Sequence, residues 1–209
     1  MLRILIADDH TVVRKGLKQI LLEEFPNALI DEVPDAEELI NKVMSGKWDV
    51  VVSDLSMPGR SGLDALQQIK LSYPDLPVLI LSIHPEEQYA LRALKSGASG
   101  YLSKDTAPDE LVKAVKKVLL GKKYISHAIA EKLASTFSAG YNKPLHENLS
   151  DREFDVMKLL ANGKSVSDIA EMLSLSVTTV STYRARVMAK MNLRSNSDLT
   201  RYAIENKLI

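Results

Sequence analysis

The sequence predicts a doubly wound α/β domain with a five-stranded parallel sheet, followed by a small all-α domain of four helices. Over residues 1–120, short apolar runs alternate with amphipathic segments of helical length, and this alternation predicts the first domain. After residue 148 the strand-like runs stop, and serine residues precede a series of amphipathic segments, which predicts the helices of the second domain (149–209). Residues 121–148 are predicted to be a linker.

The predicted strands are short runs rich in isoleucine, valine and leucine, and a segment with helical spacing of apolar residues follows each of them. The strands are Leu2–Ala7, Ala28–Val33, Val50–Ser53, Val78–Leu81 and Gly100–Leu102. The helices are Thr11–Glu24, Ala36–Met44, Gly62–Ser72, Glu86–Ser96 and Pro108–Leu120. Strands that alternate with helices are parallel, and strands this apolar are covered on both faces. We therefore expect an open, flavodoxin-like sheet with strand order 2-1-3-4-5.

Polar residues stand where the predicted strands end. Asp8 and Asp9 follow the first strand, Asp54 the third and Ser82 the fourth, and Lys104 lies just past the fifth. Functional groups of an open α/β sheet gather at the carboxyl ends of its strands. We therefore expect three carboxylates, one hydroxyl and one ammonium group in a single crevice.

These groups are suited to phosphate chemistry. Clustered carboxylates repel one another unless a cation offsets them, and oxygen ligands suit Mg²⁺ or Mn²⁺, which can bridge to phosphoryl oxygens. Asp54 can act as a nucleophile and form an acyl phosphate, while Lys104 and Ser82 contact phosphoryl oxygens. Each residue alone has an ordinary explanation as a turn, helix-cap or solvated residue. The joint pattern at four strand ends favours the phosphate site.

Residues 1–120 also resemble the receiver domain of two-component response regulators. The resemblance rests on Asp8-Asp9-His10, Asp54-Leu55-Ser56-Met57-Pro58-Gly59, Ser82 and Tyr101-Leu102-Ser103-Lys104. It implies that Asp54 is the phosphoacceptor. It also implies that Mg²⁺ is held by Asp9, by Asp54, by the backbone carbonyl of Ser56 and, through water, by Asp8.

The resemblance further implies a switch pair, in which Ser82 moves toward the phosphoryl group and Tyr101 swings inward. An ordinary half-buried strand aromatic is the alternative for Tyr101. Ser56 and His84 each stand two residues after a residue of the site, and we hypothesise that they tune the lifetime of the acyl phosphate.

The predicted linker contains one helix. Residues 121–126 interrupt the preceding helix, and His127–Phe137 then has helical spacing. Ser138–Asn148 contains Gly140 and Asn142 and is predicted to be a loop.

The second domain is predicted to begin with a capped helix. Glu153 stands three residues after Ser150, as a capping box requires, and Gly163 is expected to end this helix. The other predicted N-caps are Ser165 and Ser176, and the last two helices span Val177–Met191 and Ser197–Asn206. On the third helix, the residues expected to face inward are Val177, Val180, Val187 and Met191.

A short helix, a tight turn and a longer helix followed by positive charge are typical of a helix-turn-helix, and a small bundle that binds a protein is the alternative. No acidic residue lies between Ser174 and Met191. Small hydroxyl and arginine side chains on the third helix allow close approach to a DNA groove. The predicted DNA contacts are Thr178, Thr179, Ser181, Thr182, Arg184, Arg186 and Lys190.

This part of the chain resembles the LuxR-type helix-turn-helix of NarL/FixJ-family regulators. The matching runs are Leu149-Ser150-Asp151-Arg152-Glu153, Leu160-Ala161-Asn162-Gly163-Lys164-Ser165, Asp168-Ile169-Ala170 and Leu175-Ser176-Val177-Thr178-Thr179-Val180. Ser181-Thr182-Tyr183 replaces the Lys-x-His of common members. The run Val180-Ser181-Thr182-Tyr183-Arg184 looks closer to the virulence-regulating, Bordetella-type branch of the family.

The two resemblances together imply a phosphorylation-regulated transcription factor and not a turnover enzyme. The expected partners are a sensor histidine kinase, double-stranded promoter DNA, a second copy of the phosphorylated chain, and RNA polymerase. The net charge is zero, but residues 149–209 carry nine basic and seven acidic residues, a modest basic excess. The absence of cysteine excludes disulfides and a cysteine nucleophile. Because the sequence has neither a signal-peptide core nor a membrane span, we expect a cytoplasmic protein without a membrane partner.

Three alternatives stay open on the sequence. An aspartate-nucleophile phosphatase usually has a second carboxylate two residues after its nucleophile, where this chain has Ser56, so turnover is expected to be poor. A protein-binding adaptor fits the basic C-terminal helices less well than a DNA binder does. A DNA binder that works without phosphorylation is compatible with the same residues.

Overall fold

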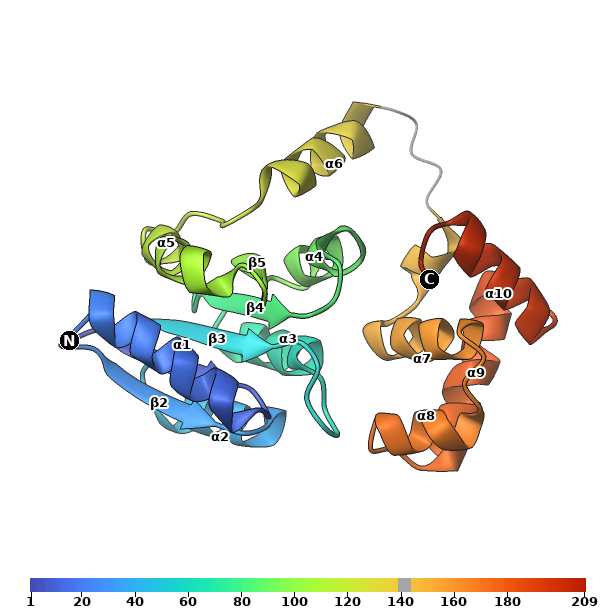
Figure 1. Ribbon diagram of the computed structural model, residues 1–209, viewed down its shortest axis with the longest axis horizontal. Helices are drawn as coiled ribbons and strands as arrows, with labels where there is room; N and C mark the ends of the chain where they lie inside the picture. Colours follow the sequence, from blue (N-terminus) through green and yellow to red (C-terminus); the bar gives the residue numbers. More distant parts are fainter. Residues whose placement is uncertain (139–143) are drawn as a thin grey trace. The chain divides into compact units, whose positions relative to one another are not determined.

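The computed structural model describes residues 1–138 and 144–209 of the 209-residue chain (Figure 1). The chain divides into two units, Met1–Thr136 and Phe137–Ile209, which are described separately below. Gly140 and Asn142, part of the expected loop, lie outside the described residues.

Five parallel strands form the sheet of the first unit, in the order β2-β1-β3-β4-β5 that the sequence predicts (Figure 1). The strands are β1 Arg3–Ala7, β2 Leu29–Val33, β3 Val50–Asp54, β4 Val78–Ser82 and β5 Gly100–Ser103. Every residue of β3 and β4 is buried, because helices cover both faces of the central strands. Asp54 and Ser82 are the last residues of their strands, so the rigid sheet itself positions them.

Helices cover the sheet on both sides (Figure 1). They are α1 Thr11–Glu24, α2 Ala36–Ser45, α3 Gly62–Ser72, α4 Glu86–Lys95 and α5 Ala107–Leu119. On one face, Leu17 and Leu21 of α1 and Leu111 of α5 pack against alternate strand residues such as Ile4 and Val52. Alternate side chains of a strand point to opposite faces, so the remaining strand residues face the other helices.

The start of α3 lies against the backbone of Asp54. The Gly62 N–H donates a hydrogen bond to the Leu55 carbonyl (2.9 Å), and a Cβ atom at Gly62 would lie 1.9 Å from the Asp54 carbonyl oxygen. Ser61 caps the helix through a capping box with Asp64. A glycine is therefore required where the chain turns from β3 into α3, directly behind the site.

The segment that follows α5 is attached to the sheet. Tyr124 forms an isolated parallel bridge with Gly100, and its N–H donates to the Ser99 carbonyl (2.8 Å). The Lys117 ammonium lies 5.5 Å from the centre of the Tyr124 ring. Helix α6, His127–Ser138, comes next. The first residues of the expected linker are thus packed on the first unit.

Four α-helices form the described part of the second unit, preceded by a short 3-10 helix, η1 Leu145–Asn148, where the sequence predicted a loop. They are α7 Asp151–Ala161, α8 Val166–Met172, α9 Val177–Met191 and α10 Asn196–Glu205. Serine side chains cap all four, at Ser150, Ser165, Ser176 and Ser195. Each cap accepts a hydrogen bond from the third residue of its helix, which fixes the turns between the helices.

The core of the second unit lies between α7, α9 and α10. Phe154, Val180, Val187 and Leu199 are fully buried there. The prediction for Val177 is wrong, because this residue is 51% exposed. The burial of α9 begins only near Val180, so its first residue stands outside the packed part of the helix.

Candidate functional site

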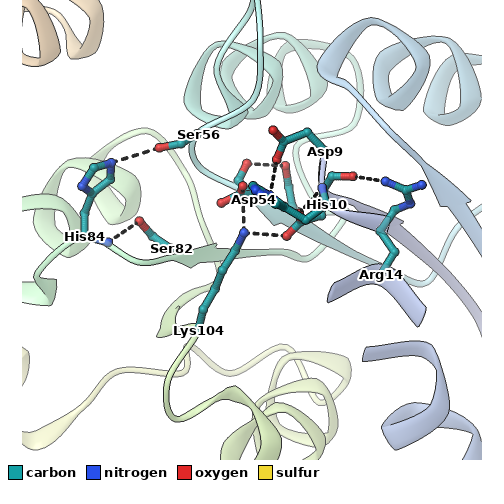
Figure 2. A network of polar contacts seen from close by, with 10 residues as sticks. Asp9, His10, Arg14, Asp54, Ser56, Ser82, His84 and Lys104 are labelled. Carbon is teal, nitrogen blue, oxygen red and sulfur yellow. Dashed lines mark hydrogen bonds and ion pairs between the residues drawn. The ribbon is translucent and has the colours of Figure 1, made fainter. Parts of the chain in front are cut away.

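The carboxyl ends of β1, β3 and β5 bring the predicted phosphate-binding residues together (Figure 2). The Lys104 ammonium nitrogen lies 2.6 Å from Asp8 Oδ2 and 2.9 Å from Asp54 Oδ2. Both carboxylates are buried, with 1% and 3% of Asp8 and Asp54 exposed. Lys104 comes directly after β5, and its N–H donates to the Ser82 carbonyl (2.8 Å), so backbone pairing directs the side chain into the crevice.

The crevice destabilises negative charge on Asp54. Burial is the main cause and raises the pKa of Asp54 to about 6, and the charge on Asp8 acts in the same direction. The Lys104 ammonium opposes both effects without cancelling them. Burial by itself lowers the pKa of Lys104, but its hydrogen bonds to Asp8 and Asp54 outweigh this, and the pKa is raised. Lys104 is therefore held as a cation between two carboxylates.

The same crevice fits a divalent cation. Asp8, Asp9, His10 and Asp54 each offer one ligand atom, and these atoms lie within 4.8 Å of one another. The atoms Asp8 Oδ2 and Asp9 Oδ1 are both shielded from solvent. Their contacts are charge contacts, to Lys104 and His10 respectively. A single ammonium does not offset three carboxylates, so the donor set is one that a hard cation would stabilise.

Ser82 and Tyr101 meet at the backbone of His84. The Ser82 hydroxyl accepts a hydrogen bond from the His84 N–H (2.9 Å), and the Tyr101 hydroxyl donates to the His84 carbonyl (2.9 Å). Tyr101 is only 3% exposed, and burial raises the pKa of its hydroxyl. The two residues predicted as a switch pair are thus joined through one residue of the loop after β4.

The side chains of Ser56 and His84 also contact each other (Figure 2). Ser56 Oγ lies 3.0 Å from His84 Nε2, which links the loop after β3 to the loop after β4. The imidazole stacks on the Tyr89 ring with 4.7 Å between ring centres. The two residues singled out in the sequence for their equal spacing therefore form one structural unit beside the crevice.

Three residues of the site were not assigned roles from the sequence. His10 contacts both acidic residues before it, Arg14 donates to the Asp8 carbonyl, and Gly62 allows α3 to approach Asp54. His10 could have been found because it directly follows the acidic pair. Arg14 follows His10 by four residues, one helical turn, so the two residues lie on the same side of α1. The sequence contains no signal for the close approach at Gly62.

The predicted DNA contacts all lie on α9, but they differ in their surroundings. Most of their side chains are exposed, as expected for a surface that binds a partner; these are Thr178, Ser181, Thr182, Arg186 and Lys190. Thr179 and Arg184 are half-buried, and Arg184 Nε donates to Asn196 Oδ1 (3.2 Å).

Lys190 forms an ion pair with the buried Glu153 (2.6 Å). Burial of Glu153 acts to raise its pKa, but the bonds to Lys190 and Ser150 prevail and lower it.

Two family models match this chain. The receiver domain of response regulators matches residues 4–116, and the luxR family of bacterial regulatory proteins matches residues 147–203. This chain belongs to the response-regulator family. Its receiver domain and its LuxR-type helix-turn-helix are those of a NarL/FixJ-type response regulator, as the sequence motifs predicted.

The response regulator is similar over its full length to proteins of known family. Response regulator UvrY of Escherichia coli K12 is 35% identical over 209 residues, which cover 100% of this chain and 96% of UvrY. Oxygen regulatory protein NreC of Staphylococcus carnosus is 37% identical over 215 residues, covering 100% and 99%. RcsB of Salmonella enterica serovar Typhimurium, solved on promoter rprA with the phosphomimetic BeF₃⁻, has a TM-score of 0.63 at 28% identity, covering 97% and 98%.

The described helices of the response regulator include none with the length and apolar character needed to cross a lipid bilayer.

Proposed function

We propose that this response regulator accepts a phosphoryl group on Asp54 and thereby controls the binding of promoter DNA by α9. The observation that carries this proposal is the Lys104 ammonium, held between Asp8 and Asp54 in a buried crevice at the end of the sheet. The similarity to RcsB, whose structure was solved on a promoter in the presence of a phosphomimetic, supports a link between phosphorylation and DNA binding.

A phosphohistidine of a sensor kinase is the proposed phosphoryl donor. An Asp54 carboxylate oxygen attacks phosphorus, a P–O bond forms, and the P–N bond to the kinase histidine breaks, leaving that histidine free. Lys104 binds one phosphoryl oxygen and the Ser82 hydroxyl donates to another. Mg²⁺, held by Asp8, Asp9, Asp54 and the Ser56 carbonyl, would supply positive charge for the phosphoryl oxygens.

Phosphorylation is proposed to act on the rest of the protein through Ser82. When its hydroxyl turns toward the phosphoryl group, it leaves the His84 N–H, and the loop that also holds the Tyr101 hydroxyl is free to move. We propose that this movement favours a dimer that reads paired DNA half-sites and contacts RNA polymerase. A solved structure of RcsB contains two dimers bound to two DNAs, which supports this assembly.

The family is one of transcription regulators and not of typical enzymes. We propose that the acyl phosphate on Asp54 is lost slowly, because the position two residues later is Ser56 and not a carboxylate that could activate water.

Ser56→Ala and His84→Ala are each expected to shorten the lifetime of the acyl phosphate. Their hydrogen bond holds together the two loops that border Asp54, and its loss admits water more readily. The expected effect is about fivefold in rate, the equivalent of one hydrogen bond of about 1 kcal/mol. The measurement is the decay of ³²P-labelled protein, and the double variant should decay no faster than either single one. An unchanged decay rate in both single variants would refute this role.

The test of the proposed function uses the full-length chain in Mg²⁺, with and without BeF₃⁻, and Asp54→Asn as the control. Oligomeric state is measured by sedimentation velocity. Affinity is measured for duplexes selected from a random-sequence library by the BeF₃⁻-treated wild type. We expect BeF₃⁻ to produce dimers and tighter DNA binding in the wild type alone. Equal DNA binding by both proteins under both conditions would show that Asp54 does not control α9.

Arg186→Ala is expected to weaken DNA binding alone, whereas Lys190→Ala is expected to weaken both DNA binding and the stability of the second unit. The logarithm of the DNA-binding constant falls linearly with the logarithm of the salt concentration, and each basic residue that contacts a phosphate contributes about one unit to this slope. Arg186→Ala should lower that dependence by about one unit and leave thermal unfolding unchanged. Lys190→Ala should also lower the thermal stability, since it leaves the buried Glu153 carboxylate without its ammonium partner. If Arg186→Ala binds duplex DNA with unaltered affinity and salt dependence, α9 does not contact DNA as proposed.

A further inference from the structure

We propose that His10 is a nitrogen ligand of the cation at the phosphorylation site, and that it raises the affinity of this site for borderline ions such as Co²⁺ and Zn²⁺ relative to Mg²⁺. The inference rests on the proposed function, because it concerns the cation that Asp8, Asp9 and Asp54 would hold. It adds a fourth protein side chain of different chemistry to that site.

The position of the imidazole is the first observation. His10 Nδ1 lies 2.8 Å from Asp9 Oδ1 and 3.4 Å from Asp8 Oδ1. His10, Asp8, Asp9 and Asp54 each offer one ligand atom, and these four atoms lie within 4.8 Å of one another. Two ligands on opposite sides of an ion at about 2.1 Å are about 4.2 Å apart. The four groups therefore need to close by only a few tenths of an ångström to surround one ion.

The backbone around His10 is the second observation. His10 occupies the N-cap position of α1, where a side chain usually accepts a hydrogen bond from the first turn, and its side chain makes no such bond within the described residues. The N-cap side chains of α2, α3 and α7–α10 make such a bond, and those of α4 and α5 do not. Instead the His10 N–H donates to Asp8 Oδ1 (2.8 Å), which fixes the backbone so that the ring faces the carboxylates.

The chemistry of a mixed ligand set follows from these positions. Carboxylate and carbonyl oxygens suit Mg²⁺ and Mn²⁺, while imidazole suits Zn²⁺, Cu²⁺, Fe²⁺ and Ni²⁺. Adding one imidazole nitrogen to the oxygen ligands strengthens the binding of the later divalent ions much more than that of Mg²⁺, which accepts water or oxygen in the same place. With 68% of its side chain exposed, His10 also lies where an ion can enter from solvent.

The experiment measures binding of Mg²⁺ and of Co²⁺ to the full-length chain by calorimetry, for the wild type, His10→Ala, Asp54→Asn and the control His127→Ala. His127 is exposed on α6, and its Nδ1 lies 3.5 Å from a carboxylate oxygen of Glu131 on the same helix. We expect His10→Ala to weaken Co²⁺ binding about tenfold or more, the scale on which even residues that only support a metal ligand act, and to leave Mg²⁺ binding unchanged. His127→Ala should bind both ions as the wild type does.

A second readout detects the nitrogen directly. With Mn²⁺ as a paramagnetic probe, electron spin echo modulation should show a coupled nitrogen in the wild type that is lost in His10→Ala. Unchanged Co²⁺ affinity and an unchanged nitrogen signal would overturn the proposal. So would tighter binding of both ions by His10→Ala, which would mean that the imidazole only pairs with Asp8 and Asp9 and competes with the cation. If the wild type and Asp54→Asn bind Mg²⁺ equally or not at all, the proposed function has failed as well.

Discussion

Asp54→Asn is expected to raise the free energy of unfolding of the receiver unit by about 2 to 3 kcal/mol at pH 7 in the absence of metal. Burial raises the pKa of Asp54 to about 6 from an ordinary value of 3.8, and each pKa unit corresponds to about 1.4 kcal/mol. Ionisation of Asp54 therefore destabilises the folded state at pH 7. Asparagine has nearly the shape of the protonated acid and cannot ionise, so the substitution removes this destabilisation. The substitution that removes the proposed phosphoacceptor should therefore also stabilise the protein.

The difference in free energy of unfolding between Asp54→Asn and the wild type should depend on pH. Below about pH 4 the carboxyl is protonated in both the folded and the unfolded chain, so the two proteins should be equally stable. Between about pH 4 and pH 6 the unfolded chain has released its proton while folded Asp54 keeps it, and the wild type loses stability as the pH rises. Above that range the stability difference between Asp54→Asn and the wild type has reached its full value and no longer changes with pH.

Trp48 makes the measurement specific to the receiver, because it is the only tryptophan of the chain and precedes β3. Urea unfolding followed by its fluorescence at pH 4, 5, 6 and 7 in EDTA should give the expected profile. Asp75→Asn, which changes an exposed aspartate, is the matched control and should show no comparable gain. If Mg²⁺ binds this site as proposed, added Mg²⁺ should narrow the difference in stability, since the folded wild type would bind the ion better than Asp54→Asn. A stability difference that does not vary with pH would contradict the buried-charge explanation.

Gly62→Ala is expected to destabilise the receiver by about 3 kcal/mol or more and to impair phosphorylation. The added methyl group would lie 1.9 Å from the Asp54 carbonyl oxygen, which belongs to the backbone of the central strand and has no room to yield. Helix α3 would have to move away from β3, and the loop of residues 55–61, which joins Asp54 to α3, would be displaced with it. Urea unfolding followed by Trp48 fluorescence measures the first effect, and incorporation of ³²P from a low-molecular-weight phosphodonor measures the second.

Gly16→Ala is the matched control for this experiment and should act in the opposite direction. Gly16 lies inside α1, and a Cβ there meets nothing within 4 Å. Alanine favours the helix by roughly 0.5 to 1 kcal/mol over glycine, so this variant should be slightly more stable and phosphorylated normally. Equal stability of Gly62→Ala and the wild type would mean that α3 can leave Asp54 at little cost.

The fold and the central residues of the site were predictable because they depend on rules that act along the chain. Alternation of apolar runs and amphipathic segments specifies parallel strands, and parallel strands bring their carboxyl ends to one edge. Asp8, Asp54 and Lys104 each follow or end a strand, so their convergence follows from the topology alone. The helix starts at Ser150, Ser165 and Ser176 were predictable for the same reason, since a cap and its helix are only three residues apart.

What the sequence could not specify are the contacts between side chains that are far apart in the chain. Lys190 and Glu153 are 37 residues apart, and they meet only because α7 and α9 pack at one particular angle and register. The same is true of Ser56 with His84, and of Tyr124 with Gly100. Side chains of these types are exposed and solvated in most proteins, so their identity carries no information about a partner.

The sequence by itself therefore determined the class of the protein, its two domains and the convergence of Asp8, Asp54 and Lys104 at the strand ends. The tertiary structure decided which of these residues are buried, how Ser82 and Tyr101 are joined through His84, and that His10 faces the acidic pair. The physical reason is that secondary structure and topology follow from local periodicity, whereas burial and pairing depend on how finished elements pack, and small changes of packing create or remove a contact within 3 Å.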